Sequence, residues 1–442
     1  MKPHIVNKAM ARRAAVSSLI GTSIEWYNFF IFNAATALLL FKDPYFANVD
    51  PTKGMLFLLG TYSVGFVARP VGGLICGHFG DRLGRKRLLV LTLLITGLAT
   101  FMIGVLPGHN AIGSVAPWLL FAFRFAQGFS VGGEWGGAVL LTVEYAPSHK
   151  RGLYGSLPQM GVPVGLLLAN LIFYGVIDEL PGGILPFAWW RVPFLLSILL
   201  VFVGLYIRLS VPESPRFEEI KNKRSKLPLL DLWRHHRREA LLAIGAKVAE
   251  NGVFYLYTVF LIAYGKHIKL DPQIILLAIS VAALLIIAAL PVYGWLSDRF
   301  GRKSIYLFGS IFAGLFAFPS FWLIQSRWPS LVILSVVLAM VLGWAAMYAP
   351  QASFFAELFK TQVRYSGASL GAQTATIFAG GFMQIVAVDL LTRTNTYWPI
   401  ALIIVVMAII TTVSVMLATE TRNKQLGSKD QDNDVPKNRI AA

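Results

Sequence analysis

The sequence is poor in charge and almost free of cysteine. Charged residues make up 14% of its 442 residues and hydrophobic residues 56%, whereas about a quarter of the residues of a typical soluble domain are charged. The single cysteine, Cys76, excludes an internal disulfide. The seven histidines show no metal-ligand spacing, and the sequence has neither a phosphate-binding glycine loop nor a nucleophile elbow. This composition favours a membrane protein over a soluble enzyme, and we expect neither a metal nor an organic cofactor.

Long apolar runs dominate the chain. Each is long enough to cross a bilayer, which takes about 20 residues, and none shows the short alternating segments of a membrane β-barrel. The runs predict an all-α integral membrane protein with twelve transmembrane helices, at residues 16–41, 54–76, 88–107, 115–145, 152–177, 189–210, 239–265, 272–296, 305–325, 330–356, 365–391 and 397–418.

The cationic residues lie mostly on one side of these spans. With the N-terminus inside, 29 of the 39 fall in cytoplasmic segments, Arg208 being counted with the central loop. Seven fall outside, and Arg69, Arg124 and Lys247 lie within spans. The positive-inside rule therefore predicts that both termini are cytoplasmic. It assigns the net charge of +17 to membrane orientation, not to nucleic-acid binding.

The chain also carries an internal repeat. GHFGDRLGRKR at 77–87 returns 217 positions later as GWLSDRFGRKS at 294–304. EYAPSHKR at 144–151 and ELFKTQVR at 357–364 are offset by 213 positions, and PESPR at 212–216 corresponds more loosely to TETR at 419–422. The repeat predicts two pseudo-symmetric six-helix bundles at 1–210 and 239–420, joined by a cytoplasmic linker at 211–238 and followed by a cytoplasmic tail at 421–442.

These motifs carry a resemblance. GHFGDRLGRKR resembles the hairpin between helices 2 and 3 of the major facilitator superfamily, which has a weaker copy between helices 8 and 9. GTSIEWYNFF (21–30), RFAQGFSVGGEWGGA (124–138), HKRGLYGSLPQMGVPVGLLLAN (149–170) and AENGVFYLYT (249–258) are similar to the metabolite:proton symporters of that superfamily.

The resemblance implies a secondary transporter in a bacterial inner membrane. It would import a small organic acid with a proton by alternating access, and we expect it to work as a monomer in the lipid bilayer. A proline or betaine importer and an exporter stay open within the class. A channel, a membrane-embedded enzyme and a transport-dead receptor are alternatives outside it, although no nucleophile or metal cluster is visible in the spans.

In the superfamily the hairpins brace the two halves when the cytoplasmic side is closed, so the resemblance implies a gate. Locally, Asp81 can cap helix 3 or pair with Arg85. The alternative is that these charges only set topology and cap exposed helix ends. The expected gate comprises Gly77, Asp81, Arg82, Arg85, Glu144, Arg151, Gly294, Asp298, Arg299, Arg302, Glu357 and Arg364, and Glu213, Arg216 and Glu420 complete the belt.

Charges within spans are costly and usually functional. Helices 1, 4, 7 and 10 line the cavity in the superfamily, and three of them carry such charges. Arg124 is the candidate carboxylate clamp, because a guanidinium pairs bidentately. The expected substrate and proton cavity comprises Glu25, Asn28, Arg124, Gln127, Glu134, Lys247, Glu250, Tyr348 and Gln351.

Proton coupling needs an acid that titrates. Family members usually have aspartate where this chain has Asn28, which cannot take up a proton. Glu25 lies three residues away on the same face and can inherit the role, or it can be a permanent partner of Arg124. Glu134 is the competing proton site.

Three further features have a structural reading. Lys247 and Glu250 can form a structural pair, and Arg69, near the inner end of helix 2, can extend to the membrane surface. Glycines 128, 132 and 136 indicate close helix packing, with direct contact to the solute as the alternative. The tail after Glu420 spans 22 residues, which disfavours the osmosensing carriers, because those have long coiled-coil tails.

Overall fold

The computed structural model describes residues 8–37, 45, 51–179, 189–214, 228–422, 424 and 426, and this part of the chain contains helices and no β-strand. The helices of the first half are α1 (Lys8–Ala37), α3 (Pro51–Leu83), α4 (Arg85–Val105), α5 (His109–Ile112), α6 (Val115–Tyr145), α7 (Arg151–Gln159), α8 (Gly161–Glu179) and α9 (Val192–Leu209). Short 3-10 turns at Ser148–Lys150 and Trp189–Arg191 precede α7 and α9.

The second half begins with the short helix α11 (Pro228–His235). It continues with α12 (Arg237–Tyr255), α13 (Leu261–His267), α14 (Pro272–Phe300), α15 (Arg302–Gln325), α16 (Pro329–Leu338), α17 (Ala345–Leu358), α18 (Arg364–Ala375), α19 (Met383–Thr394) and α20 (Trp398–Leu417). Three π-helical turns join α12 to α13, α16 to α17 and α18 to α19, at Leu256–Phe260, Ala339–Trp344 and Thr376–Phe382. Each of the twelve predicted spans coincides with one of these helices or joined helix pairs.

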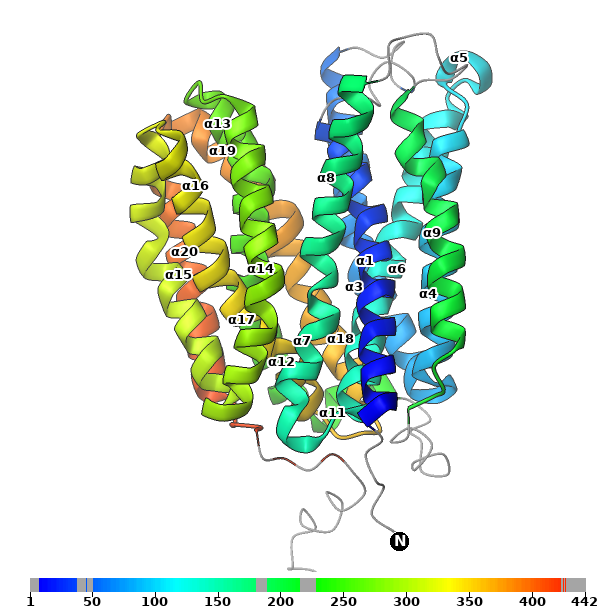
Figure 1. The fold of residues 1–442 in the computed structure, drawn as a ribbon. Coiled ribbons are helices and arrows are strands. Elements are labelled where there is room, and N and C mark those ends of the chain that lie inside the picture. Colours follow the sequence, from blue (N-terminus) through cyan, green and yellow to red (C-terminus); the bar gives the residue numbers. More distant parts are fainter. Residues whose placement is uncertain are drawn as a thin grey trace, which may run out of the picture.

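The helices form two groups that meet at one end of the molecule. Figure 1 shows α1, α3, α4, α6, α8 and α9 standing together, with α13 to α16, α19 and α20 on the other side. The groups approach each other at the end where α1 begins and stand apart at the opposite end. The two repeated hairpins, α3–α4 and α14–α15, turn at the closed end, which we call the hairpin end.

The most polar helices lie inside the molecule. Eight helical segments of the described residues are long and apolar enough to cross a membrane by length and composition. Helices α1, α3, α6 and α12 are not among the eight, and they carry most of the buried charges. Every residue of α6 from Ser130 to Glu144 and every residue of α17 is buried. Their polar groups are therefore shielded from the lipid by the surrounding helices.

Glycines allow α3 and α6 to pack closely. A Cβ atom on Gly128 would lie 2.0 Å from the carbonyl oxygen of Gly65, and one on Gly132 would lie 2.0 Å from that of Arg69. Gly136 faces the other helical group, where a Cβ would lie 2.2 Å from the Ser369 hydroxyl. The packing interpretation of these glycines is confirmed, since any side chain would force the helices apart.

Each hairpin turns on a glycine with left-handed backbone geometry. Gly84 separates α3 from α4 with φ 110°, and Gly301 separates α14 from α15 with φ 104°. Side chains with a Cβ rarely adopt such angles. The two glycines are 217 positions apart, so the repeat in the sequence is also a repeat in backbone conformation.

Candidate functional site: an interlocked helix end and a buried charged centre

The aspartate of the first hairpin caps a helix of the opposite half. Asp81, at the end of α3, accepts hydrogen bonds from the backbone amides of Tyr365 (3.1 Å) and Ser366 (3.0 Å) and from the Ser366 hydroxyl (2.9 Å). These groups open α18, whose free amides and dipole favour a negative charge. The expectation that Asp81 caps the helix that follows it is wrong, because the first amides of α4 are bound by Glu213 instead.

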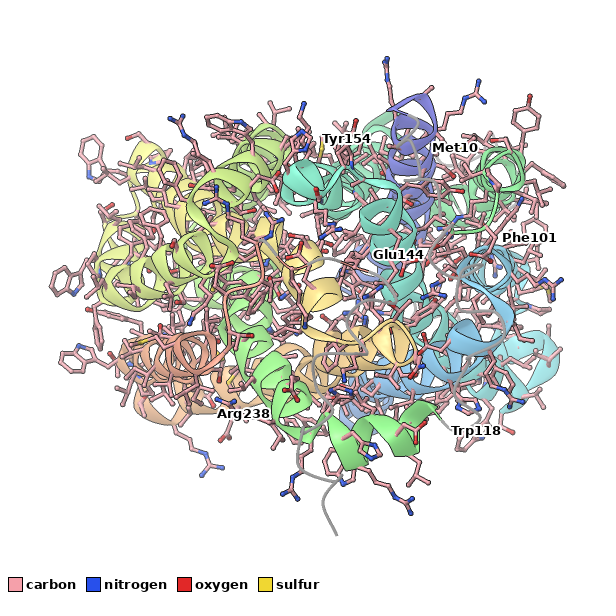
Figure 2. All side chains as sticks on the ribbon, turned by 90° about the horizontal axis from the view of Figure 1, so that it is seen from below. Met10, Phe101, Trp118, Glu144, Tyr154 and Arg238 are labelled. Carbon is pink, nitrogen blue, oxygen red and sulfur yellow. The ribbon has the colours of Figure 1, made fainter. Side chains whose placement is uncertain are left out.

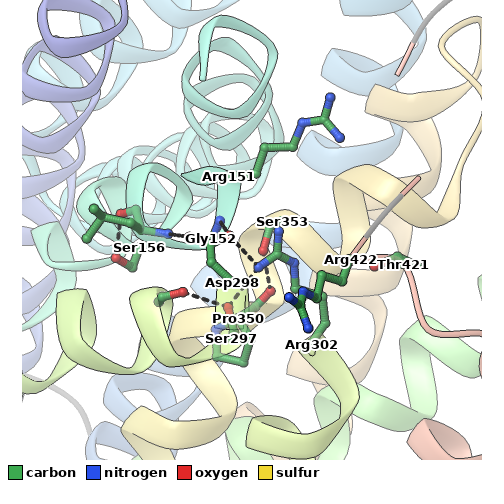
Figure 3. Close-up of polar contacts among 12 residues, drawn as sticks. Arg151, Gly152, Ser156, Ser297, Asp298, Arg302, Pro350, Ser353, Thr421 and Arg422 are labelled. Atoms are coloured by element: carbon green, nitrogen blue, oxygen red, sulfur yellow. Dashed lines mark hydrogen bonds and ion pairs between the residues drawn. The ribbon is translucent and has the colours of Figure 1, made fainter. Parts of the chain in front are cut away.

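The second hairpin repeats this contact in the reverse direction. Asp298, at the end of α14, accepts from the backbone amides of Gly152 (2.8 Å) and Leu153 (2.9 Å) in the first turn of α7. It also binds the Arg302 guanidinium at 2.7 Å, as Figure 3 shows. Each half therefore donates a carboxylate to a helix N-terminus of the other, and the two contacts hold the halves together at the hairpin end.

Two buried glutamates bind arginines from both halves. Glu144 pairs with Arg85 of its own half (3.2 Å) and with Arg364 of the other half (3.1 Å). Seen from the hairpin end, Glu144 lies near the middle of the face (Figure 2). The side chains of all three are at most 1% exposed. They are therefore not the exposed loop charges of the alternative interpretation.

Glu357 repeats this arrangement in the second half. It pairs with Arg302 of its own half (3.2 Å) and with Arg151 of the other (3.7 Å). The Arg151 guanidinium also donates to the backbone carbonyl of Lys424 at 2.6 Å. Both glutamates thus bridge the halves, and the segment after α20 adds a further contact to the first half.

An outer pair of glutamates completes the set. Glu213 accepts from the first two amides of α4 at 3.1 Å each, and Glu420 accepts from the first two amides of α15 at 3.0 Å each. The residue after each of them, Ser214 or Thr421, donates to Glu144 or Glu357. The loose third correspondence of the sequence repeat is therefore also a structural one.

The remaining expected gate residues are placed differently. Gly77 and Gly294 lie at close contacts between the halves, where a Cβ would come within 2.9 Å of Ser366 Cα and 2.6 Å of the Gly152 carbonyl oxygen. Arg82 and Arg299 are exposed, and the Arg299 guanidinium lies over the rings of two neighbours on its own helix. Arg216 lies outside the described residues.

In the first half, two acids share one buried arginine. Arg208 of α9 donates to Glu134 at 2.8 Å and lies 3.6 Å from Glu25. Thr22 donates to Glu134 (2.9 Å) and Thr92 to Glu25 (3.2 Å). Glu25 Oε2 has no hydrogen-bond partner among the described residues.

This arrangement corrects two expectations. The partner of Glu25 is Arg208, not Arg124. Arg208 itself is 3% exposed and does not belong with the charges of the central loop. Its position inside the predicted span 189–210 was the signal that could have identified it. Two acids and one arginine leave this cluster with one negative charge when both acids are ionised.

Arg124 lies inside the first half and has no acidic partner among the described residues. It is fully buried, and its guanidinium binds the side-chain oxygens of Gln127 (3.1 Å) and Asn33 (2.6 Å). It lies 4.0 Å from the centroid of the Phe29 ring, and its Nε has no hydrogen-bond partner among the described residues. Gly65 of α3 leaves room for it, since a Cβ there would lie 2.7 Å from Nε. The predicted shared face of Arg124 and Gln127 is confirmed.

Arg69 does not extend to the membrane surface as expected. It is 2% exposed, donates to the Tyr255 hydroxyl of α12 at 2.8 Å, and lies 4.2 Å from the Phe29 ring centroid. Its Nε and Nη2 have no hydrogen-bond partner among the described residues. Arg69 is therefore a second buried cation, and sequence reasoning missed it because it treated the residue as interfacial.

The second half contributes a closed polar cluster. Lys247 forms an ion pair with Glu250, one turn away on α12, and donates to Gln351 at 2.8 Å. The indole of Trp344 donates to Glu250 at 2.7 Å. The ammonium also lies 5.0 Å from the centroid of the Tyr348 ring. The structure thus brings the four expected residues of this half together, and their pairing leaves the cluster neutral.

Asn28 differs from these residues because its side chain is buried yet unpartnered. It is fully buried, and neither its Oδ1 nor its Nδ2 has a hydrogen-bond partner among the described residues. Only its backbone carbonyl is used, at 3.4 Å from the Gln127 amide nitrogen. A buried amide that lacks a partner is costly, so Asn28 remains a candidate contact for a ligand.

Two helical halves that interlock at one end and enclose buried charges define a multi-pass membrane transporter. The chain belongs to the Major Facilitator Superfamily, whose model matches residues 19–383. It is 37% identical to the shikimate transporter of Escherichia coli (strain K12) over 427 residues, covering 93% of this chain and 95% of the relative. It is 30% identical to the proline/betaine transporter of the same strain over 442 residues, covering 96% and 86%.

The fold also matches a solved structure. The proton:xylose symporter XylE bound to 6-bromo-6-deoxy-D-glucose superposes with a TM-score of 0.74, covering 95% of this chain and 98% of that one. The two sequences are 16% identical, so this likeness concerns the fold alone. It agrees with the twelve-helix architecture predicted from the apolar runs.

Proposed function

We propose that this protein is a secondary active carrier that imports a small carboxylate, together with a proton, across a bacterial inner membrane. The observation that carries the proposal is Arg124, a fully buried guanidinium that binds only neutral groups among the described residues. A buried cation without an acid is costly, and a carboxylate ligand would supply the missing charge. The similarity to a shikimate transporter supports an organic acid as the solute.

In this proposal the hairpin end is the cytoplasmic end, and the protein works as a monomer. Helix α1 begins at the hairpin end (Figure 1), and without the buried Arg208, 28 of the 39 cationic residues fall on that side of the predicted spans. The molecule would then be closed toward the cytoplasm. Import requires the interlocked contacts between the two helical halves to break when the carrier opens toward the cytoplasm. A topology reporter fused after Ser225 or Asp430 should remain cytoplasmic, and an external reporter would contradict the orientation.

The proton is the proposed coupling ion, with no other cofactor. The cluster of Glu25, Glu134 and Arg208 supports this role, because one cation cannot neutralise two acids. Glu25 is the proposed carrier of the proton, since its Oε2 is free of hydrogen bonds within the described part and Arg208 lies closer to Glu134 (2.8 Å) than to Glu25 (3.6 Å).

Substitution of Arg124 tests the carboxylate clamp. Arg124→Lys keeps the charge but loses the planar fork, so the affinity for an organic acid such as shikimate should fall by about tenfold or more. Binding is measured by calorimetry on the purified protein, with Arg393→Lys as the control, because Arg393 is 74% exposed on its side chain. Parent-like binding by Arg124→Lys would place the clamp elsewhere. Binding of betaine or proline, but of no acid, would replace the proposal with an osmolyte carrier.

Substitution of Glu25 tests the proton site. Glu25→Gln should leave exchange of solute across proteoliposome membranes intact and abolish accumulation driven by an imposed pH gradient. Glu134→Gln is the matched comparison, because both acids share Arg208. If Glu134→Gln alone abolishes accumulation, the proton site is Glu134. If the parent shows no pH-driven uptake, the carrier is not coupled to protons.

A further inference from the structure

Two buried guanidiniums lie against one aromatic ring. The central carbon of Arg69 is 4.2 Å from the centroid of Phe29, and that of Arg124 is 4.0 Å from the same centroid. The distance between the two guanidinium carbons is therefore at most the sum of these two distances to the ring centroid. Each residue comes from a different helix, Arg69 from α3 and Arg124 from α6, and Phe29 comes from α1. The arrangement is built by the first half alone.

Neither guanidinium is neutralised within the described part of the chain. The acids of the first half, Glu25 and Glu134, bind Arg208, and Glu250 binds Lys247. Aromatic faces compensate the positive charges only weakly. Besides Phe29, Arg69 lies 4.8 Å from the centroid of the Trp26 ring. The attraction of a cation to a ring offsets only a small part of what burial of a lone charge costs.

The free atoms of Arg69 form one edge of its guanidinium. Its Nη1 donates to Tyr255 of the second half, whereas Nε and Nη2 have no hydrogen-bond partner among the described residues. Nε and Nη2 together are the edge that binds both oxygens of a carboxylate in a bidentate pair. Arg69 is 2% exposed, so such a pair would form away from bulk water, where it is strongest.

We propose that Arg69 is a second anion-binding residue and that the carrier takes a dianion, a dicarboxylate held by Arg69 at one end and by Arg124 at the other. The inference rests on the proposed function and narrows its substrate class. Phe29, which contacts both guanidiniums, must move aside when the ligand binds. Arg69 also donates to Tyr255 of the second half. The Arg69 end of the ligand site is therefore the end that contacts the second half.

The test compares each diacid with its own monoamide. Malonate, succinate, glutarate and adipate are titrated calorimetrically into the purified full-length protein, each beside the monoamide that has the same shape and one charge fewer. In the parent, one of the diacids should bind about 10- to 100-fold more tightly than its monoamide. Arg69→Gln should abolish this preference and keep the weaker monoamide binding through Arg124. Arg69→Lys should restore part of the preference, because the charge remains.

The control and the contrary outcomes separate this inference from the proposed function. Arg393→Gln, which removes an exposed cation, should keep the parent preference. If the parent binds monocarboxylates and diacids equally, or if Arg69→Gln retains the preference for the diacid, the dianion inference fails and the carboxylate carrier stands. If no carboxylate of either charge binds, both fail. A folding defect is recognised by a lowered unfolding temperature and is bypassed with Arg69→Lys.

Discussion

The hairpin end of the molecule is symmetric, and its charged centre is not. At the hairpin end the main contacts are paired: Asp81 and Asp298, 217 positions apart, cap helices of the opposite half, and Glu144 and Glu357, 213 positions apart, each bind one arginine from either half. In the centre, the first half holds Arg69, Arg124 and an acid pair on Arg208, whereas the second half holds a neutral lysine–glutamate pair.

The difference follows from what each region must do. Closure needs two equivalent halves, so the repeat is kept there in sequence and in geometry. In the proposed function the ligand is bound mainly by side chains of the first half, so the ligand site does not need the repeat. The positions 213 to 217 residues after Arg124 are occupied by the apolar run 337–341, and those after Arg69 by the apolar run 282–286. The second half therefore has no copy of either guanidinium.

The largest effect is expected from removing the cation of the acid pair. Arg208→Gln leaves Glu25 and Glu134 buried together without a counter-charge, and breaking a buried ion pair in this way costs about 3–5 kcal/mol. We expect a fall of this size in the free energy of unfolding, measured by chemical denaturation of the purified protein. No comparable loss is expected from any single exposed charge of the hairpin end.

A compensated variant shows whether the charge or the shape causes this loss. Glu25→Gln and Glu134→Gln, added to Arg208→Gln, replace the charged cluster with neutral hydrogen-bonding groups of similar size. This triple variant should recover most of the stability. If it remains as unstable as Arg208→Gln alone, packing around Arg208 is responsible, since Gly21 leaves space for its guanidinium.

A smaller and symmetric effect is expected from the two hairpin aspartates. Asp81→Ala and Asp298→Ala each remove a helix cap worth about 1–2 kcal/mol, and both weaken the closed hairpin end. Spin labels at exposed positions Arg82 and Arg299, in a Cys76→Ala background, should report a larger population with separated halves in either variant. Transport should fall more than ligand affinity, because the population of conformations changes and the ligand site does not.

Equal responses are the essential result here. If only Asp81→Ala separates the halves, the second hairpin does not contribute to closure. The two hairpins would then not be equivalent in function. If Asp81→Ala transports normally but loses affinity, the hairpin end does not control the conformation at all.

The smallest effect is expected at the exposed cations of the same hairpins. Arg299→Gln and Arg82→Gln should each change the free energy of unfolding by less than about 0.5 kcal/mol, since both side chains are exposed. Arg302→Gln is the matched comparison three positions after Arg299, because it is fully buried and holds Glu357 and Asp298. Similar losses in Arg299→Gln and Arg302→Gln would show that burial does not distinguish these charges.

The sequence predicts the helices well because hydropathy is a local property. It also predicts the repeat, since matching motifs need only be aligned. It could not predict that Asp81 caps α18, because the local alternatives, the next helix or a neighbouring arginine, satisfy the same spacing. Arg208 and Arg69 were misplaced for a related reason: a long cation near a span end can reach water or remain buried, and only the packing of the other helices decides which. Asn28 is buried, as its place within a predicted span indicates, but its lack of a partner among the described residues is visible only in three dimensions.

The three π-helical turns lie in the second half, at Leu256–Phe260, Ala339–Trp344 and Thr376–Phe382. A π turn holds one residue more than an α turn and absorbs it by unwinding locally, so removal of a single residue from one of them would restore regular α-helix while both flanks keep nearly the same faces. The turn at Ala339–Trp344 ends in the indole that binds Glu250. A one-residue deletion in the regular α-helical part of that helix would instead turn its outer flank by about 100°. The π turns are thus the places where these helices of the second half can lose one residue without turning their polar faces.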